Sequence, residues 1–428
     1  SGAGVPLWTN RYNGPDNLDD EASAVAVDGS GNVFVTGSSG FPFGDYATIA
    51  YSGAGVPLWT NRYSAPGNSY DGATAVAVDG SGNVFVTGYS GYFDGFDAFH
   101  DYATIAYSGA GVPLWTNRYH GPANGDDKAT ALAVDASGNV FVTGFSASAS
   151  PRFEPAYDYA TIAYSRTGGV LWIKRYSGPG NGNDYANAVA VDASGNVFVT
   201  GNSATIAYSG AGVALWTNRY NGAASAIAVD VSGNVFVTGG SPGSGGDPDF
   251  ATIAYSGAGA ALWANRYGGR GAASDFANAV AVDGSGNVFV TGSSGVSGGD
   301  SDYATIAYSG AGVPLWTNRY GGSANTFDEA DAVAVDGSGN VFVTGRSYSA
   351  GGNSEYVTIA YSGAGVPLWT NRSGAGGANS VAVDRSGNVF VTGYSYGSGG
   401  DFDYATIAYS GAGVPLWTNR LGGTYYSD

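Results

Sequence analysis

The chain of 428 residues contains no cysteine, no methionine and only two histidines, His100 and His120. Without cysteine it can form neither a disulfide bond nor a thiolate metal site. Because sulfur side chains are frequent targets of oxidants, their absence is compatible with an extracellular protein. The two histidines are accompanied by no H-E-x-x-H motif, no phosphate-binding loop and no nucleophile–base pattern. We therefore expect no catalytic residues and a protein that is not an enzyme.

Positive charge and long apolar runs are also scarce. There are 16 basic and 34 acidic residues, which gives a net charge of −18. Nucleic acids and anionic membrane surfaces repel a chain this acidic, so we expect neither as a partner. No apolar run approaches the length of a membrane-spanning helix, so membrane insertion is not expected. No signal peptide is recognisable and the first residue is Ser1, so we interpret the chain as a mature or trimmed product.

Glycine and aromatic residues are abundant, and most of them belong to an internal repeat of roughly fifty residues. The segment S-G-A-G-V-P-L-W-T-N-R and its variants occur nine times, each marked by a tryptophan. Two further segments, close to A-V-A-V-D-G-S-G-N-V-F-V-T-G and to A-T-I-A-Y, occur eight times each. Verbatim copies of the first segment lie at residues 1–11, 52–62, 108–118, 309–319, 362–372 and 410–420.

Each repeat holds four strand-like runs separated by turn sequences, and no run shows helical periodicity. A-V-A-V has the smallest side chains, which fits a crowded strand next to a ring axis. The run V-P-L-W-T-N-R carries proline, which is tolerated mainly on edge strands, so it should lie outermost. Eight such units predict an all-β, eight-bladed β-propeller of four-stranded antiparallel blades. A β-solenoid is the main alternative.

The prediction treats residues 1–428 as a single propeller domain in which residues 1–12 form an extra outer strand. Such a strand can close the ring, fray, or mark a cut in a longer repeat array. It can also pair with the open edge of a second molecule, and head-to-tail addition of this kind builds a filament. The side chains expected in these assembly strands are Val5, Leu7, Trp8, Val414, Leu416 and Trp417. The blades are expected at residues 22–63, 73–119, 129–176, 187–220, 224–267, 277–320, 330–372 and 378–421.

The run A-V-D-G-S-G-N-V-F-V-T-G followed by D-Y-A-T-I-A-Y-S resembles the bacterial β-propeller repeat called the SBBP repeat. The resemblance covers all eight repeats and therefore nearly the whole chain. It implies the propeller fold and an origin among large secreted or surface proteins. It implies no enzymatic activity, and a fold by itself does not fix a function.

Antiparallel strand order places the uniform D-G-S-G-N and S-G-A-G turns at one end of the ring and loops of variable length at the other. Binding residues usually lie on variable loops of a rigid scaffold. Two aromatic-rich loops, within residues 89–101 and 145–158, predict a patch for glycan stacking or protein contact. The alternative is that these rings bury one another over the blade ends. The predicted binding residues are Tyr92, Phe93, Phe96, Phe99, Phe153 and Tyr157.

Acidic residues cluster just before the inner strands, at Asp19 and Asp20 and again at Asp126 and Asp127. Carboxylate oxygens are the ligands that Ca²⁺ prefers, so these four residues are candidate calcium ligands, although no EF-hand spacing is present. The alternative is that the carboxylates accept hydrogen bonds from backbone N–H groups in turns. We expect that turn-forming role for the D-G-S-G-N aspartates. No other cofactor is expected.

These observations favour a non-enzymatic extracellular structural protein that assembles with itself, head to tail, into a fibre by donating outer strands. The alternative is a monomeric secreted or cell-surface adhesion module that recognises a glycan or a protein through its variable loops. The expected location is outside a bacterial-type cell or on its surface.

Overall fold

The structure of this chain, a computed structural model, consists of β-strands joined by turns and loops. No helix occurs among the residues that it describes, and so none that is long and apolar enough to cross a membrane. The backbone alone is described for residues 92, 93, 98 and 415–420. The described residues are 14, 18–40, 44–65, 70–93, 98–123, 125–148, 156–179, 182–243, 246–269, 273–296, 300–322, 326–349, 351–396 and 401–420.

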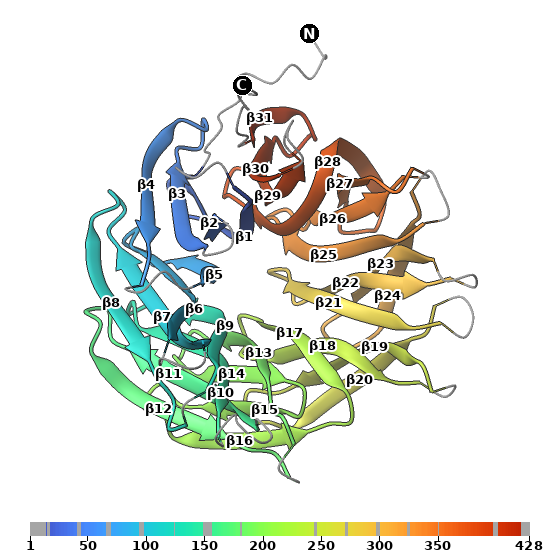
Figure 1. The fold of residues 1–428 in the computed structure, drawn as a ribbon. Coiled ribbons are helices and arrows are strands. Elements are labelled where there is room, and N and C mark those ends of the chain that lie inside the picture. Colours follow the sequence, from blue (N-terminus) through green and yellow to red (C-terminus); the bar gives the residue numbers. More distant parts are fainter. Residues whose placement is uncertain are drawn as a thin grey trace, which may run out of the picture.

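The strands form a ring of radially arranged antiparallel sheets around a central channel (Figure 1). The first three sheets contain β1 (Asp20–Val27), β2 (Val33–Ser39), β3 (Asp45–Tyr51), β4 (Pro57–Tyr63), β5 (Asp71–Val78), β6 (Val84–Phe93), β7 (Ala98–Tyr107), β8 (Pro113–Tyr119), β9 (Asp127–Val134), β10 (Val140–Ala147), β11 (Tyr157–Tyr164) and β12 (Val170–Tyr176). The next three contain β13 (Ala186–Val191), β14 (Val197–Gly201), β15 (Ala204–Tyr208), β16 (Ala214–Arg219), β17 (Ala223–Val229), β18 (Val235–Pro242), β19 (Pro248–Tyr255), β20 (Ala261–Tyr267), β21 (Asp275–Val282), β22 (Val288–Gly295), β23 (Ser301–Tyr308) and β24 (Pro314–Tyr320). The last sheet contains β25 (Asp328–Val335), β26 (Val341–Tyr348), β27 (Ser354–Tyr361), β28 (Pro367–Val383), β29 (Val389–Tyr396), β30 (Phe402–Tyr409) and β31 (Pro415–Arg420).

The prediction of eight separate four-stranded blades is wrong, because the described strands form seven sheets. Six sheets have four strands, and the last has seven because the 17-residue strand β28 belongs to both of the final repeats. The connection between these repeats is reduced to small residues, so β28 pairs with β27 as far as Ala375 and with β29 from Gly376 onward. The connecting run S-G-A-G-G is shorter than the loop at this place in most other repeats.

The predicted order of strands within a repeat is confirmed. The A-V-A-V strands line the channel and the proline-containing strands lie at the periphery (Figure 1). The second and third strands are buried on both faces, and their side chains form clusters that join one sheet to the next. In one such cluster, Phe34 and Tyr46 of the first sheet pack against Val84, Ile105 and Tyr107 of the second. Burial of each large apolar side chain contributes about 1.5–3 kcal/mol, so these junctions hold the ring together.

The repeated tryptophan ties each outer strand to a turn of the neighbouring sheet. Trp59 Nε1 donates to the carbonyl oxygen of Gly109 at 2.9 Å, and Asn61 Nδ2 donates to that of Gly111 at 2.7 Å. A Cβ atom at Gly111 would lie 2.6 Å from the indole Cγ of Trp59, and the φ of Gly111 is +79°. Glycine is therefore required both by backbone conformation and by the close approach of the ring. The same indole bond recurs at Trp115, Trp172, Trp216, Trp263, Trp316 and Trp369.

The aspartates of D-G-S-G-N are turn formers, as expected. In the first repeat, Asp28 Oδ1 accepts hydrogen bonds from the backbone N–H groups of Ser30 and Asn32, each at 2.8 Å. Its second oxygen accepts the Asn32 side-chain amide, also at 2.8 Å. These bonds fold the turn between the first and second strands from within the segment itself. The same set occurs at Asp79, Asp135, Asp192, Asp230, Asp283, Asp336 and Asp384.

The two ends of the described chain meet side by side in the ring (Figure 1). Asn379 Nδ2 donates to the carbonyl oxygen of Ala22 at 2.9 Å, and the Phe402 N–H donates to Asp19 at 2.9 Å. The C-terminal copy of the outer strand, β31, pairs with β30 and fills the outer position of the last sheet. Of the predicted assembly residues, Val414 is 50% exposed, and only the backbone of β31 is described at Leu416 and Trp417. The predicted residues Val5, Leu7 and Trp8 lie outside the described residues.

The indole–glycine contact predicts a position-specific loss of stability. A Cβ at Gly312, whose φ is +78°, would lie 2.5 Å from Trp263. Replacing Gly312 with alanine should therefore lower the free energy of unfolding by about 2–4 kcal/mol, measured by urea denaturation. The control is Gly284→Ala, since nothing lies within 4 Å of a Cβ there and Ala136 and Ala193 occupy the same position in other repeats. Equal destabilisation by both variants would contradict the proposed role of the contact.

Candidate binding site

An acid–serine–arginine network recurs at the variable-loop end of the sheets. In the sixth sheet, Asp275 is 1% exposed and accepts hydrogen bonds from the Gly269 N–H at 2.6 Å and from Ser294 Oγ at 2.5 Å. Arg319 donates to Ser294 Oγ at 2.8 Å and forms an ion pair with Asp302 at 3.1 Å. The network thus ties the connection between sheets to all four strands of one sheet. Two acidic residues of the repeat are thus held by hydrogen bonds and an ion pair within the protein itself.

Two of the four predicted calcium ligands, Asp20 and Asp127, occupy the same position as Asp275. Burial raises the pKa of both carboxyl groups, while hydrogen bonds from serine side chains act against the shift. Asp127 accepts the Gly121 N–H at 2.6 Å, and Asp20 accepts the Gly14 N–H at 3.2 Å. Both carboxylates therefore bind backbone N–H groups, which is the structural role that the sequence offered as the alternative. Calcium binding by these residues stays a prediction.

The other two predicted ligands make contacts between sheets. Asp19 accepts the Phe402 N–H, as described above, and links the first sheet to the last. Asp126 accepts hydrogen bonds from His100 Nδ1 at 2.8 Å and from the His100 N–H at 3.1 Å. Burial acts to raise the pKa of Asp126. The hydrogen bonds from His100 and the charge of Lys128 outweigh that effect and lower the pKa below its ordinary value.

Both histidines lie at the junction between the second and third sheets. His100 and Asp101 are on β7, and the second histidine, His120, lies on the connection from β8 to β9, where its Nδ1 is 2.8 Å from Asp101 Oδ1. Asp101, His120 and Asp127 each place one ligand atom within 4.8 Å of the other two, and no other such group of three occurs in the described part of the chain. One nitrogen and two carboxylate oxygens suit Zn²⁺ better than Ca²⁺, which prefers oxygen ligands. The second oxygen of Asp101 is held by Arg118 at 3.1 Å.

Aromatic rings gather at the next junction, between the third and fourth sheets. Phe145 contacts Tyr157 and Tyr185 edge to face, with ring centroids 5.2 and 5.0 Å apart, and all three rings are half-buried. Burial raises the pKa of Tyr157, and the nearby carboxylate of Asp126 adds to the shift, so the rings and the acids share one surface. At the junction of the second and third sheets, the ring of Tyr89 contacts the ring of His100 edge to face and stacks on that of Tyr70, with centroids 5.2 and 5.8 Å apart. Lys128 Nζ lies 5.0 Å from the centroid of the Tyr89 ring.

The predicted binding residues are therefore placed as follows. Tyr157 belongs to the cluster with Phe145, and Phe99 is half-buried on β7. Tyr92 and Phe93 lie on β6, where Tyr92 pairs with Phe99 through the backbone, and their side chains are not described. Phe96 and Phe153 lie outside the described residues. Tyr70 and Tyr185 were missed, because each stands before an inner strand rather than in the two aromatic-rich loops.

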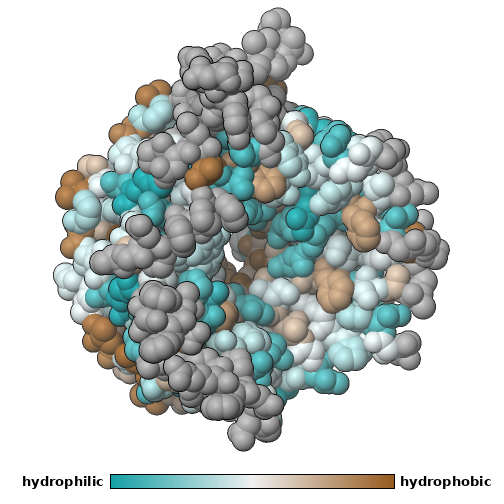
Figure 2. Space-filling view, in the orientation of Figure 1, coloured by the Kyte–Doolittle hydropathy of each residue, from teal (hydrophilic) through white to brown (hydrophobic). Residues whose placement is uncertain are grey.

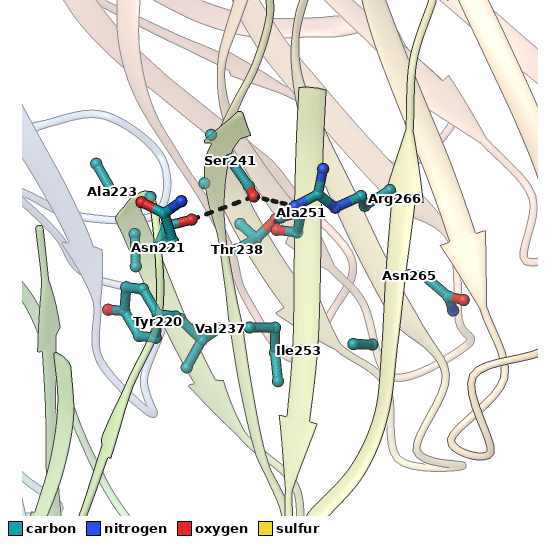
Figure 3. A pocket seen from close by; sticks show the side chains of 15 residues that line it. Tyr220, Asn221, Ala223, Val237, Thr238, Ser241, Ala251, Ile253, Asn265 and Arg266 are labelled. Carbon is teal, nitrogen blue, oxygen red and sulfur yellow. Dashed lines mark hydrogen bonds between the residues drawn. The ribbon is translucent and has the colours of Figure 1, made fainter. Parts of the chain in front are cut away.

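A cavity that the sequence did not indicate lies in the fifth sheet (Figure 3). Its volume is about 220 Å³, and its lining includes Val237, Ala251 and Ile253 from β18 and β19. Arg266 lies at one edge of the cavity and donates to Ser241 Oγ at 2.6 Å. Seen in the orientation of Figure 1, most of the described side chains around the central opening are hydrophilic (Figure 2).

A closed ring of radial antiparallel sheets, with uniform turns at one end and variable loops at the other, defines a β-propeller. The family model named SBBP, a β-propeller repeat, matches residues 7–44, 171–205, 263–299 and 374–401. These matches confirm the resemblance noted from the sequence, and the chain is a β-propeller repeat protein.

Solved structures extend the similarity of fold to the whole ring. The propeller of Dos1 has a TM-score of 0.58 and 11% sequence identity, over 99% of this chain and 97% of that one. A eukaryotic initiation factor has a TM-score of 0.51 and 8% identity, over 98% of this chain and 91% of that one. At such low identity these likenesses show the fold alone. A comparison with curated proteins found no match.

One carboxyl group near the channel has a strongly displaced pKa. Asp331 lies at the bulge of β25, and burial together with the charge of Glu329 raises its pKa to about 7, against the opposing charge of Arg346. At the same position in other repeats, Asn278 donates to the carbonyl oxygen of Ala330 at 3.0 Å, and Asn379 makes the equivalent bond. A carboxyl group can donate such a bond only while it is protonated.

We therefore expect Asp331 to make stability depend on pH. Because its folded pKa of about 7 lies above the ordinary value of 3.8, the stabilisation is complete below about pH 4 and is lost as the pH rises to 7. The Asp331→Asn variant should be more stable than the parent at pH 8, by on the order of 1–4 kcal/mol, and no more stable at pH 4. Thermal unfolding across this range measures the effect. The reverse change, Asn278→Asp, should introduce the same loss, and parallel curves for all three proteins would contradict the assignment.

Proposed function

We propose that this β-propeller is a non-catalytic extracellular binding module that recognises a glycan or protein ligand with the loops at the variable end of the ring. The contrast between the two ends supports this proposal. Turns at one end repeat the same internal hydrogen bonds in every repeat, whereas loops at the other end differ in length and composition. A rigid scaffold that presents variable loops is the usual arrangement of a binding protein.

The observation that carries the proposal is the aromatic and polar surface over the third sheet and its junctions with the second and fourth sheets. The rings of Phe145, Tyr157 and Tyr185 come from two strands and a sheet connection and hold one another edge to face. On the neighbouring junction, His100 and Asp126 hold each other through a contact of 2.8 Å between Nδ1 and Oδ1. Rings that are already ordered can stack on a sugar or a side chain without a further loss of side-chain entropy. We therefore expect the ligand to be a glycan.

A glycan array probed with the labelled chain tests this function. Replacing Tyr157 and Tyr185 together with alanine should weaken binding to any glycan detected by about tenfold, since each aromatic contact contributes about 0.5–1.5 kcal/mol. The control is Tyr396→Ala, which removes a ring that is 44% exposed in the last repeat. Absence of any glycan signal, or equal losses from both variants, would remove the support for this surface. Repeating the measurement with EDTA and with added Ca²⁺ tests the calcium proposal in the same assay.

Self-assembly by strand donation remains a second proposal, and one feature of the chain favours it. Residues 1–11 repeat residues 410–420 verbatim, and β31, which contains residues 415–420, fills the outer position of the last sheet. Residues 1–12 therefore carry a second copy of a strand whose acceptor position exists in every molecule. Exchange of one copy for the other between two molecules would join them through main-chain hydrogen bonds.

Electron microscopy and solution mass of the purified chain, at several concentrations, test the assembly proposal. If residues 1–12 are the donor, the full chain should form filaments or oligomers, and a version lacking residues 1–12 should give single rings. A version lacking residues 411–428 keeps the donor and frees the acceptor, so it should assemble at least as readily as the full chain. Single rings from all three proteins at every concentration would exclude strand donation.

A further inference from the structure

An aromatic ring passes from one repeat into the next at seven places around the ring. In these repeats the third strand carries a tyrosine or phenylalanine directly before the A-T-I-A-Y motif or its variant V-T-I-A-Y. Each of these rings is at most 2% exposed and belongs to the hydrophobic cluster of the following repeat. The residues are Tyr46, Tyr102, Tyr159, Phe250, Tyr303, Tyr356 and Tyr404.

Five of the six tyrosine hydroxyls have a common acceptor. Tyr46 donates to the carbonyl oxygen of Ala103 at 3.1 Å, and Tyr102 donates to that of Ala160 at 3.1 Å. These alanines stand at the same position on the third strand of the following repeat. Tyr159, Tyr356 and Tyr404 make the equivalent bonds. Each of these five junctions therefore contains a socket for one phenol group, with apolar walls and one main-chain oxygen.

The fourth sheet does not supply such a ring to the fifth. The hairpin between β14 and β15 is reduced to Asn202 and Ser203, and Ser203 stands where the other repeats have an aromatic residue. The cluster of the fifth sheet accordingly contains no ring from the third strand of the fourth sheet, although Phe198 and Trp216 of that sheet and the connecting residue Tyr220 belong to it. Ala251 and Ile253 are only half-buried, whereas the residues at the same two positions in the other repeats are at most 2% exposed.

The space that this substitution leaves is the cavity of about 220 Å³. Gly239 lies in its wall, at the position of Gly88 and Gly144, where a tyrosine hydroxyl lies 2.9 and 2.8 Å from the place of a Cβ atom. The nearby Tyr220 does not fill the space with its hydroxyl, which bonds instead to Thr200 Oγ1 and to the Gly201 carbonyl oxygen, each at 2.7 Å. The fifth sheet therefore has the walls of this socket, but no tyrosine ring of the preceding repeat fills it.

The cavity is accessible from the variable-loop end. A second hollow of about 280 Å³ shares Gly222, Ala223, Gly240 and Ser241 with it and extends to Phe276. The connection from β16 to β17 is only three residues long, so this connection is too short to cover the entrance. Arg266 and Ser241 lie at the edge of the cavity and give it a polar margin (Figure 3).

We propose that this cavity binds a small ligand through a single phenol ring, the group that fills the same socket at other junctions. The walls are the valine, isoleucine and alanine that pack against a tyrosine elsewhere, and the Ala251 carbonyl oxygen is the equivalent acceptor. The size is sufficient, because an apolar cavity of about 150 Å³ in another protein binds benzene. This site is independent of the proposed glycan surface on the second and third sheets.

Titration with p-cresol, which is the tyrosine side chain as a free molecule, tests the proposal. Calorimetry should show one saturable site, with NMR shifts confined to the methyl groups of Val237 and Ile253 and their neighbours. Toluene, which lacks the hydroxyl, should bind about fivefold more weakly, since one hydrogen bond contributes about 1 kcal/mol. No p-cresol binding, or binding with shifts spread over all junctions, would overturn the assignment.

Two substitutions that occupy the cavity complete the test. Ser203→Tyr restores the residue of the other repeats and should abolish p-cresol binding, whereas its matched control Ser203→Ala should leave binding unchanged. Because the short hairpin can direct a tyrosine elsewhere, Ala251→Leu provides a second block from the cavity wall. Retention of p-cresol binding in both Ser203→Tyr and Ala251→Leu, each verified as folded by its thermal transition, would show that the ligand binds at another place.

Discussion

The contact between one sheet and the next is the constraint on which the rest of the structure depends. Each sheet is too small to bury its own apolar faces, so it is stable only between two neighbours. The indole of the outer strand reaches over a glycine turn, as Trp263 does over Gly312, and the ring on the third strand reaches into the next core. Every repeat must pack against both of its neighbours, and this requirement explains why the motif residues vary so little along the chain.

That constraint also explains how much of the fold could be predicted from the sequence. Strand order, the inner and outer positions and the D-G-S-G-N turns follow from local residues, because Asp28 and its equivalents form their turns within five residues. The number of sheets does not follow from local residues. Whether β28 is one strand or two depends on the conformation of a short glycine-rich connection, and the repeat count carries no information about it.

The candidate sites were less predictable, for a physical reason that the acidic residues illustrate. Asp20 and Asp127 stand in acidic clusters in the sequence, yet in space each carboxylate meets a backbone N–H and a serine. The pairing of His120 with Asp101 joins residues on a strand and on a later connection, and nothing in the sequence indicates it beyond the rarity of histidine. Side chains that meet across a sheet junction are separated by about a whole repeat, so motif spacing cannot report them.

The residues at which one repeat differs from the others are therefore the most informative residues in this chain. A residue that every repeat shares is explained by the ring itself, as the tryptophans and turn aspartates are, and needs no ligand. A residue that one repeat changes leaves its neighbours with a contact missing or added. Ser203 removes a ring and uncovers Ile253, while His100 and His120 add polar groups at a single junction. Because the other repeats show what each junction needs for stability, these departures mark the places where the structure can be adapted to a ligand without loss of the ring.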